Sequence, residues 1–408
     1  MTSRERVLAA MNHREPDRVP IDLSGHRSSG ISAIVYPKLR QLLGLPPKPL
    51  RVYDPVQQLA IMDEDVLDRF GVDTLELGRG FALQDSDWTD WVLPDGTKCQ
   101  IPAWVKPERQ GSQWVIRSKS GRVIAILPEG GLYFEQVYYP FLETDNLDAI
   151  PEALEESLWC AVDSPPGPLA KGPNGNRMLS EGARKLRAST ERAIIGLFGG
   201  SLFELGQFLY RNDRFFMLLA ESPEQAHAFL DKVVELHLAD LEDFLEAVGN
   251  SIDVILFGDD LGMQTGPLIS LEMYRQFFKP RHEMMWKRAK ELAEAKVMLH
   301  CCGGIRELIP DLIEAGLDAI NPVQITARGM EAKGLKADFG DQLTLWGGGC
   351  DTQDILANST PDQVSKHVKE QVRILSPGGG FVFQQVHNIL ANVPPENIVA
   401  MCDAVNSP

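Results

Sequence analysis

The sequence lacks long hydrophobic runs, has few cysteines and is short of positive charge, and each shortage excludes a class of protein. No apolar run approaches the roughly 20 residues that a membrane-spanning helix needs, and the polar segment 1–18 does not resemble a secretory signal peptide. Six cysteines among 408 residues do not have the density of a disulfide framework. A formal charge of −17 argues against nucleic acid and anionic membrane surfaces as partners. We therefore expect a cytoplasmic protein.

What the sequence does contain is a repeated pattern of short apolar runs, each followed by a helical segment or a long connection. The runs lie at residues 18–23, 72–77, 192–198, 252–257, 296–300, 317–321, 343–347 and 380–384. Right-handed crossovers between parallel strands lead either to an open doubly wound sheet or to a closed barrel. Eight units favour an α/β fold of the (β/α)8 TIM-barrel type, formed by residues 1–408 as a single domain.

Residues 84–139 interrupt this pattern. Several tryptophans, proline-rich breaks and a glycine-containing turn at 119–122 indicate short antiparallel strands. The segments 113–117 and 122–127 form a plausible hairpin. We interpret the stretch as an inserted β-hairpin module that lies outside the βα repeat.

Polar side chains gather at the ends of the predicted strands. They are Asp22, Arg79, Asp259, Asp260, His300, Cys302, Gln324, Cys350, Gln384 and His387. In a barrel the carboxyl ends of all strands meet on one face, where active sites form. We therefore predict one site on that face.

The run 296–304 ends in an imidazole, two thiols and two glycines. Because side chains alternate along a strand, His300 and Cys302 point to one face and Cys301 to the other. Imidazole and thiolate are ligand types that Zn²⁺ prefers. Cys350, at the end of another apolar run, is the third predicted ligand. The alternative is a buried histidine with small apolar thiols.

Several other positions have two interpretations. Asp259 and Asp260 supply a fourth ligand or a proton acceptor, or they are a cap and turn pair. His387 contacts substrate or metal, or it is a hydrogen-bonded core histidine. His26 and Arg27 clamp a carboxylate, or they lie in a solvated loop. We assign catalysis to Asp260, Gln324 and His387, and substrate binding to Asp22, His26, Arg27, Arg79 and Gln384.

Motifs along almost the whole chain resemble those of the uroporphyrinogen decarboxylase superfamily. They are Arg18–Asp22, Phe70–Asp73, Gly258–Gly262, His300–Gly303, Asn321–Gln324, Gly347–Gln353, Gly378–Phe381 and Val393–Ile398. The resemblance implies the (β/α)8 barrel. True decarboxylases carry an arginine-rich signature after the first strand, ending in Gly-Arg-Tyr-Leu-Pro, and this chain has Leu23–Ser29 there.

The chain most resembles the zinc- and cobamide-dependent methyltransferase branch, which binds zinc through His-x-Cys and a distant Cys. Its thiol-methylating members place that Cys after the last strand, where this chain has His387. The resemblance implies transfer of a methyl group from a methylated small molecule, such as a methoxy compound or a methylamine, to a corrinoid. The corrinoid (cobalamin) is expected on a partner protein, and a homodimer is compatible with this interpretation.

Two rival functions stay open. One is a uroporphyrinogen decarboxylase-like decarboxylase, with Asp22 or Asp73 and Arg27 or Arg79 at its site. The other is a non-catalytic barrel that binds a corrinoid or another tetrapyrrole. Porphyrinogen turnover would favour the first, and tight corrinoid binding without a metal would favour the second.

Overall fold

One parallel sheet forms the centre of the computed structural model, which describes residues 1–405 and 407. Its strands run in the order β17-β16-β15-β14-β11-β10-β3. They are β3 (Thr74–Glu76), β10 (Ala193–Gly199), β11 (Val254–Gly258), β14 (Lys296–His300), β15 (Ala319–Asn321), β16 (Thr344–Trp346) and β17 (Phe381–Val382). Every neighbouring pair is parallel. The structure thus confirms an α/β protein with seven of the eight predicted strands.

The first predicted strand, at 18–23, is reduced to a single bridge. Ile21 pairs in parallel with Phe383, beyond one edge of the sheet. On the other side, the Asp73 N–H donates to the Ile21 carbonyl oxygen over 2.8 Å. Pro20 has no N–H to extend a ladder, although its carbonyl accepts from the Phe383 N–H. The short segment therefore hydrogen-bonds to the residues beside both edge strands without forming a strand.

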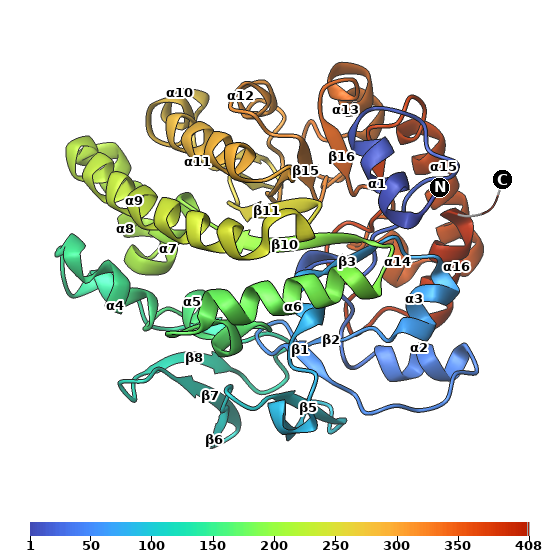
Figure 1. Cartoon of the computed structure of the whole chain (residues 1–408), viewed down its shortest axis with the longest axis horizontal. Coiled ribbons are helices and arrows are strands. Elements are labelled where there is room, and N and C mark those ends of the chain that lie inside the picture. Colours follow the sequence, from blue (N-terminus) through green and yellow to red (C-terminus); the bar gives the residue numbers. More distant parts are fainter. Residues whose placement is uncertain (406, 408) are drawn as a thin grey trace.

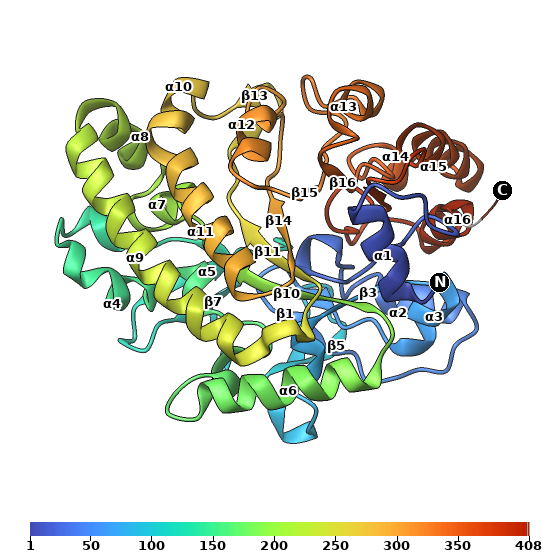
Figure 2. The ribbon, with the colours of Figure 1, turned by 45° about the horizontal axis from the view of Figure 1, so that its top comes forward.

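Helices cover the outside of the sheet (Figures 1 and 2). They are α1 (Ser3–Met11), α2 (Tyr36–Leu42), α3 (Glu64–Phe70), α4 (Ile150–Leu154), α5 (Leu158–Ala161), α6 (Gly175–Ser189), α7 (Phe203–Tyr210), α8 (Asn212–Glu221), α9 (Pro223–Val248), α10 (Leu271–Met273), α11 (Lys279–Leu292), α12 (Ile309–Glu314), α13 (Ala332–Phe339), α14 (Ile355–Asn358), α15 (Pro361–Leu375) and α16 (Pro395–Val405). α9 packs between α6 and α11, and α15 packs against α16. None of the helices described here is long and apolar enough to cross a membrane.

Alternate strand residues face two separate cores. Met298 belongs to an inner cluster with Leu256 and Trp346, which residues of α1 complete. Leu299 belongs instead to the large core that the strands share with the surrounding helices. His300 follows Met298 by two positions and so continues the inner face of β14.

Small antiparallel sheets make up the inserted segment. β4 (Trp88–Val92) pairs with β5 (Lys98–Pro102). A second sheet contains β6 (Glu108–Gln110), β7 (Gln113–Arg117), β8 (Val123–Leu127) and β9 (Glu135–Gln136). The predicted hairpin is the β7–β8 pair. In the described chain no strand of the segment pairs with the central sheet, and Figure 1 shows the segment beneath that sheet.

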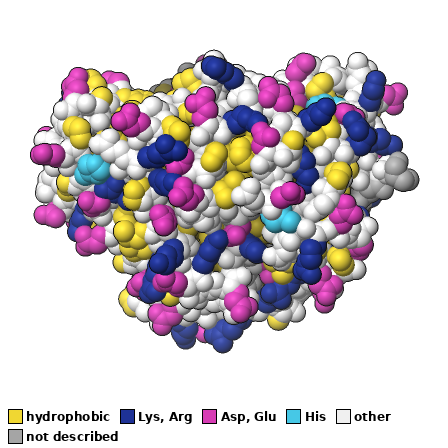
Figure 3. All heavy atoms as spheres, turned by 90° about the horizontal axis from the view of Figure 1, so that it is seen from above, with side chains coloured by type: hydrophobic (Ala, Val, Ile, Leu, Met, Phe, Trp, Pro, Cys, Tyr) yellow, Lys and Arg dark blue, Asp and Glu magenta, His cyan; other side chains and the backbone are white. Residues whose placement is uncertain are grey.

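Two further short hairpins complete the strands. β1 (Val52–Asp54) pairs with β2 (Leu59–Ala60), and β12 (Gly262–Met263) pairs with β13 (Gly266–Pro267). β1 precedes the inserted segment, and β12 begins four residues after the end of β11. On the face drawn in Figure 3, lysine and arginine side chains are interspersed with aspartate and glutamate.

Candidate metal and substrate site

His300, at the carboxyl end of β14, lies together with Cys302 and His387, which follow β14 and β17. One ligand atom from each side chain lies within 4.8 Å of the other two. The His300 Nε2 is 3.4 Å from the Cys302 Sγ, and the two imidazole centroids are 5.5 Å apart. His387 has a left-handed φ of 64°, a strained conformation that concentrates at functional sites in proteins.

The three side chains fit a zinc ion. A thiolate sulfur at about 2.3 Å and an imidazole nitrogen at about 2.0 Å from one tetrahedral zinc lie roughly 3.5 Å apart. The separation of 3.4 Å between Cys302 and His300 matches that value. Three protein ligands also leave one tetrahedral position for a substrate, as catalytic zinc sites do.

Asn321 fixes the tautomer of His300. Its side-chain nitrogen donates to the Trp346 carbonyl oxygen over 3.0 Å, and this acceptor determines which way the amide points. The Asn321 Oδ1 therefore accepts from the His300 Nδ1 over 2.8 Å. With its proton on Nδ1, His300 presents the Nε2 lone pair toward Cys302, which is the orientation that a metal ligand needs.

We expect Asn321→Leu to lower zinc affinity roughly 10- to 100-fold, because the variant cannot hold the ring or the tautomer of His300. Affinity would be measured by competition with a chelator. Asn397→Leu is the matched control, since Asn397 is also buried and donates to two carbonyls, but away from the cluster. Equal affinities in the two variants would contradict this role for Asn321.

A network of buried polar side chains hydrogen-bonds to Asn321 and holds it in place. Gln384 Oε1 accepts from Asn321 Nδ2 over 2.7 Å and lies 3.1 Å from His26 Nε2. Burial opposes ionisation of Asp22, but His26 and the hydrogen bond from Trp346 bring the pKa of Asp22 below its usual value. Asp22, His26 and Gln384, which the sequence assigns to substrate binding, thus lie together with internal partners and position the site.

Asp260 and Gln324 hold the loop that carries Cys302. Asp260 accepts from the Cys302 N–H over 2.7 Å, and Gln324 accepts from the Gly303 N–H over 2.9 Å. The Asp260 carboxylate also lies 3.9 Å from the His300 Nε2 and is 35% exposed. Asp260 is thereby placed beside the cluster, where it would serve as a fourth metal ligand or as a proton acceptor.

Asp259 holds the start of α7, a helix that precedes it in the chain. Its carboxylate accepts from the N–H groups of Phe203 and Glu204, both at 2.9 Å, at the start of α7. The carboxyl of Glu204 adjoins Asp260, and burial together with the charge of Asp260 raises the pKa of Glu204 well above its usual value. No sequence pattern points to Glu204, because it lies on α7 and not at the end of a strand.

Cys350 does not belong to the cluster, and the predicted ligand set is corrected at this position. The residue is fully buried in the core shared with the helices, and its Sγ faces the Asp351 carbonyl oxygen. Gly347 and Gly348 precede it with φ values of 127° and 72°, so the alternation of β16 does not continue to Cys350. His387, expected to be catalytic, occupies the third position.

Burial keeps both imidazoles of the cluster neutral. It lowers the pKa of His387 to about 3 and also lowers the pKa of His300. Burial and the charge of Asp260 raise the pKa of the Cys302 thiol well above its usual value. Neutral imidazole is the form that binds a metal, and a metal cation opposes the rise for the thiol.

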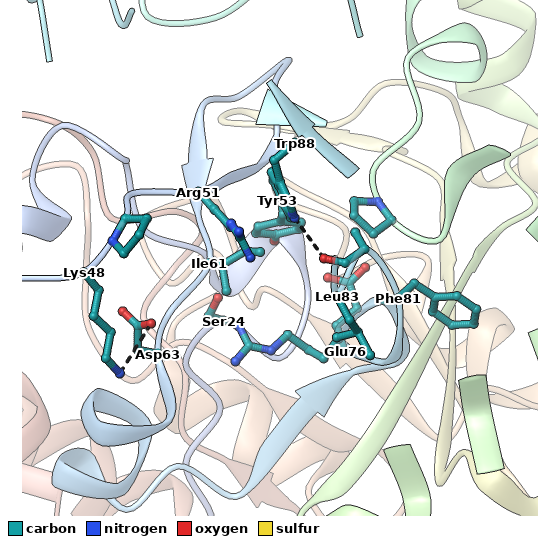
Figure 4. A pocket seen from close by; sticks show the side chains of 15 residues that line it. Ser24, Lys48, Arg51, Tyr53, Ile61, Asp63, Glu76, Phe81, Leu83 and Trp88 are labelled. Carbon is teal, nitrogen blue, oxygen red and sulfur yellow. Dashed lines mark hydrogen bonds and ion pairs between the residues drawn. The ribbon is translucent and has the colours of Figure 1, made fainter. Parts of the chain in front are cut away.

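A cavity of about 320 Å³ is lined in part by Ser24, which lies between Asp22 and His26 of the buried polar network (Figure 4). Its lining includes Ser24, Arg51, Tyr53, Glu76, Arg79 and Trp88. Arg79, predicted to bind substrate, therefore lines the cavity. Arg27 lies on the loop that follows Ser24, and its Nε is 3.6 Å from the Asp54 carboxylate.

Fold and site together define an α/β enzyme with a candidate metal centre at the carboxyl ends of its parallel strands. The chain belongs to the uroporphyrinogen decarboxylase (URO-D) family, whose model matches residues 172–408.

Two known proteins illustrate the relationship. The uroporphyrinogen decarboxylase of Alkalilimnicola ehrlichii is 25% identical over 243 residues, which cover 56% of this chain and 62% of the relative. The matched stretch thus spans less than two thirds of that protein. A methyltransferase from Methanosarcina mazei superposes with a TM-score of 0.58 at 17% identity, covering 100% of this chain and 98% of that one. The second similarity is one of fold.

Proposed function

We propose that this protein is a zinc-dependent methyltransferase that moves a methyl group from a methylated small molecule to a corrinoid on a partner protein. The observation that carries the proposal is the His300–Cys302–His387 cluster at the strand ends. The likeness of fold to the Methanosarcina methyltransferase, along the whole chain, supports it. The proposal includes a complete (β/α)8 barrel in which residues 20–22 take the eighth strand position.

In the proposed reaction, the bond between the methyl carbon and the heteroatom of the donor breaks. The heteroatom keeps the electron pair of that bond, and the cobalt(I) corrinoid supplies the pair for the new bond to carbon. Zinc, when bound, supplies Lewis acidity at the heteroatom. Asn321 keeps His300 in the ligand tautomer, and Asp260 is placed to exchange a proton with the heteroatom.

A methyl-transfer assay tests the proposal. Zinc-loaded protein with cob(I)alamin should form methylcobalamin, followed by its absorbance, from at least one of a panel of methoxyaromatics, methylamines and methyl thioethers. Formation from none of them, together with release of CO₂ from a porphyrinogen, would contradict the proposal.

Decarboxylation is the second candidate, because the family model and the relative from Alkalilimnicola carry that name. In the stretch 23–29 this chain offers one arginine, Arg27. Asp73 is fully buried and is engaged by Arg6 and Arg18, so it faces no substrate. Chelator treatment separates the two candidates. A decarboxylase would still release CO₂ after the treatment, whereas the zinc-dependent methyltransferase would lose its methyl-transfer activity.

A further inference from the structure

We infer that the cavity beside the cluster binds the ring and the carboxylate of a methylated aromatic acid. The identity of the methyl group as the reacting group rests on the proposed function. Binding of the acid does not, and it can be measured without a corrinoid.

The volume and lining of the cavity suit an aromatic ring. Its volume of about 320 Å³ lies at the lower end of the range for small-molecule sites. Tyr53 comes from β1, Trp88 from β4, and Phe81 from the turn after β3. Figure 4 shows Tyr53 and Ser24 pointing toward the same central space, with Ile61 beside them.

Two buried polar atoms at this place make no hydrogen bond to the described residues. Tyr53 is 8% exposed and lines the cavity, and its hydroxyl makes no hydrogen bond. The Nε of Arg27, on the adjoining loop, is likewise buried and makes no hydrogen bond, and it lies 3.6 Å from the Asp54 carboxylate. Buried polar groups in folded proteins are almost always satisfied, so the Tyr53 hydroxyl indicates a partner that a ligand supplies.

The charges around the cavity favour an anion. Lys48, Arg51 and Arg79 line it, against Asp63 and Glu76, although the chain as a whole carries −17. Burial raises the pKa of Glu76 to about 7, so below neutral pH this carboxyl is mostly uncharged. The lining then has an excess of positive charge, which suits a carboxylate and disfavours a methylammonium ion.

The arginines retain the capacity to bind a ligand. Arg51 pairs with Asp85 and Arg79 with Glu64, whose side chains are 97% and 58% exposed. Ion pairs of this kind are screened by solvent and hold their partners weakly. A buried ligand carboxylate can therefore compete for either guanidinium.

One loop joins the cavity to the candidate metal centre. Ser24 lines the cavity, and the Nε2 of His26, two residues later, lies 3.1 Å from the Gln384 Oε1. Gln384 in turn accepts from Asn321, whose Oδ1 accepts from the His300 Nδ1. The cavity and the cluster are thus connected through one loop and its hydrogen bonds.

The test compares two probes of equal shape, 4-methoxybenzoate and 4-methoxybenzamide, titrated calorimetrically into zinc-loaded protein without corrinoid. At about pH 6 we expect the acid to bind roughly tenfold or more tightly than the amide. Tyr53→Phe should weaken binding of the acid roughly tenfold. Tyr138→Phe is the control, because its hydroxyl donates to Glu143 outside the cavity.

The pH dependence gives an independent readout. Glu76 faces His26 and Arg27 of the loop, Tyr53 and Asp54 of β1, and Arg79. Raising the pH through about 7 ionises Glu76 and places a negative charge beside the bound carboxylate, so affinity for the acid should fall. Affinity for the amide should stay constant, and the Glu76→Gln variant should bind the acid with much weaker pH dependence.

Each outcome separates this inference from the proposed function. Equal affinity for acid and amide, or no binding of either, would overturn the inference, even if another methyl donor reacts. Tight, charge-dependent binding of the acid without formation of methylcobalamin from any donor would support the cavity assignment and contradict the methyltransferase.

Discussion

Cys302→Ala should lose its stoichiometric zinc and at least roughly 10³-fold of the methyl-transfer rate, because a lost Lewis acid removes several kcal/mol of transition-state stabilisation. Cys301→Ala should retain both. The two thiols are adjacent in sequence, but Cys301 lies in the core shared with the helices, where its sulfur accepts from the Leu261 N–H. Elemental analysis and the methylcobalamin assay check both variants.

The comparison of Cys302→Ala with Cys301→Ala tests whether the direction in which each side chain points decides zinc binding. Both variants remove one sulfur from the same loop, so a general loosening of that loop would affect them alike. Equal zinc loss in the two variants, or retention in both, would show that Cys302 is not the metal ligand.

His387→Ala should lose zinc as Cys302→Ala does, and Cys350→Ala should retain it. The sequence alone predicts the opposite pair of outcomes, because it makes Cys350 the third ligand and assigns His387 to catalysis. The geometry places His387 in the cluster and Cys350 in the apolar core. Retention of zinc in His387→Ala would show that His387 is not a zinc ligand.

Most of the fold follows from the sequence, because buried parallel strands are short apolar runs that end in polar residues. Periodicity also identified the face of β14 that carries His300 and Cys302. It failed at 18–23, where Pro20 removes a ladder donor and the edge pairing is shared between two distant partners. A segment that forms a single bridge and one that forms a full strand have the same local pattern of apolar residues in the sequence.

The sequence predicts that the site lies at the strand ends, but it does not predict which of the side chains there contact one another. Three consecutive glycines before Cys350 remove the pleat on which its assignment depended. Asn321 ends β15 within a motif that the sequence singled out, yet its role depends on Trp346 of the next strand. Tyr53 comes from a hairpin outside the βα repeat, and only the packing of distant segments brings it to the cavity.

The central claim is that His300, Cys302 and His387 hold one zinc ion. Elemental analysis combined with zinc-edge X-ray absorption, on protein purified without chelator, tests it most directly. We expect one zinc per chain with a single sulfur neighbour at about 2.3 Å and the remaining neighbours nitrogen or oxygen at about 2.0–2.2 Å. A protein without zinc, or a zinc with two sulfur neighbours, would contradict the account.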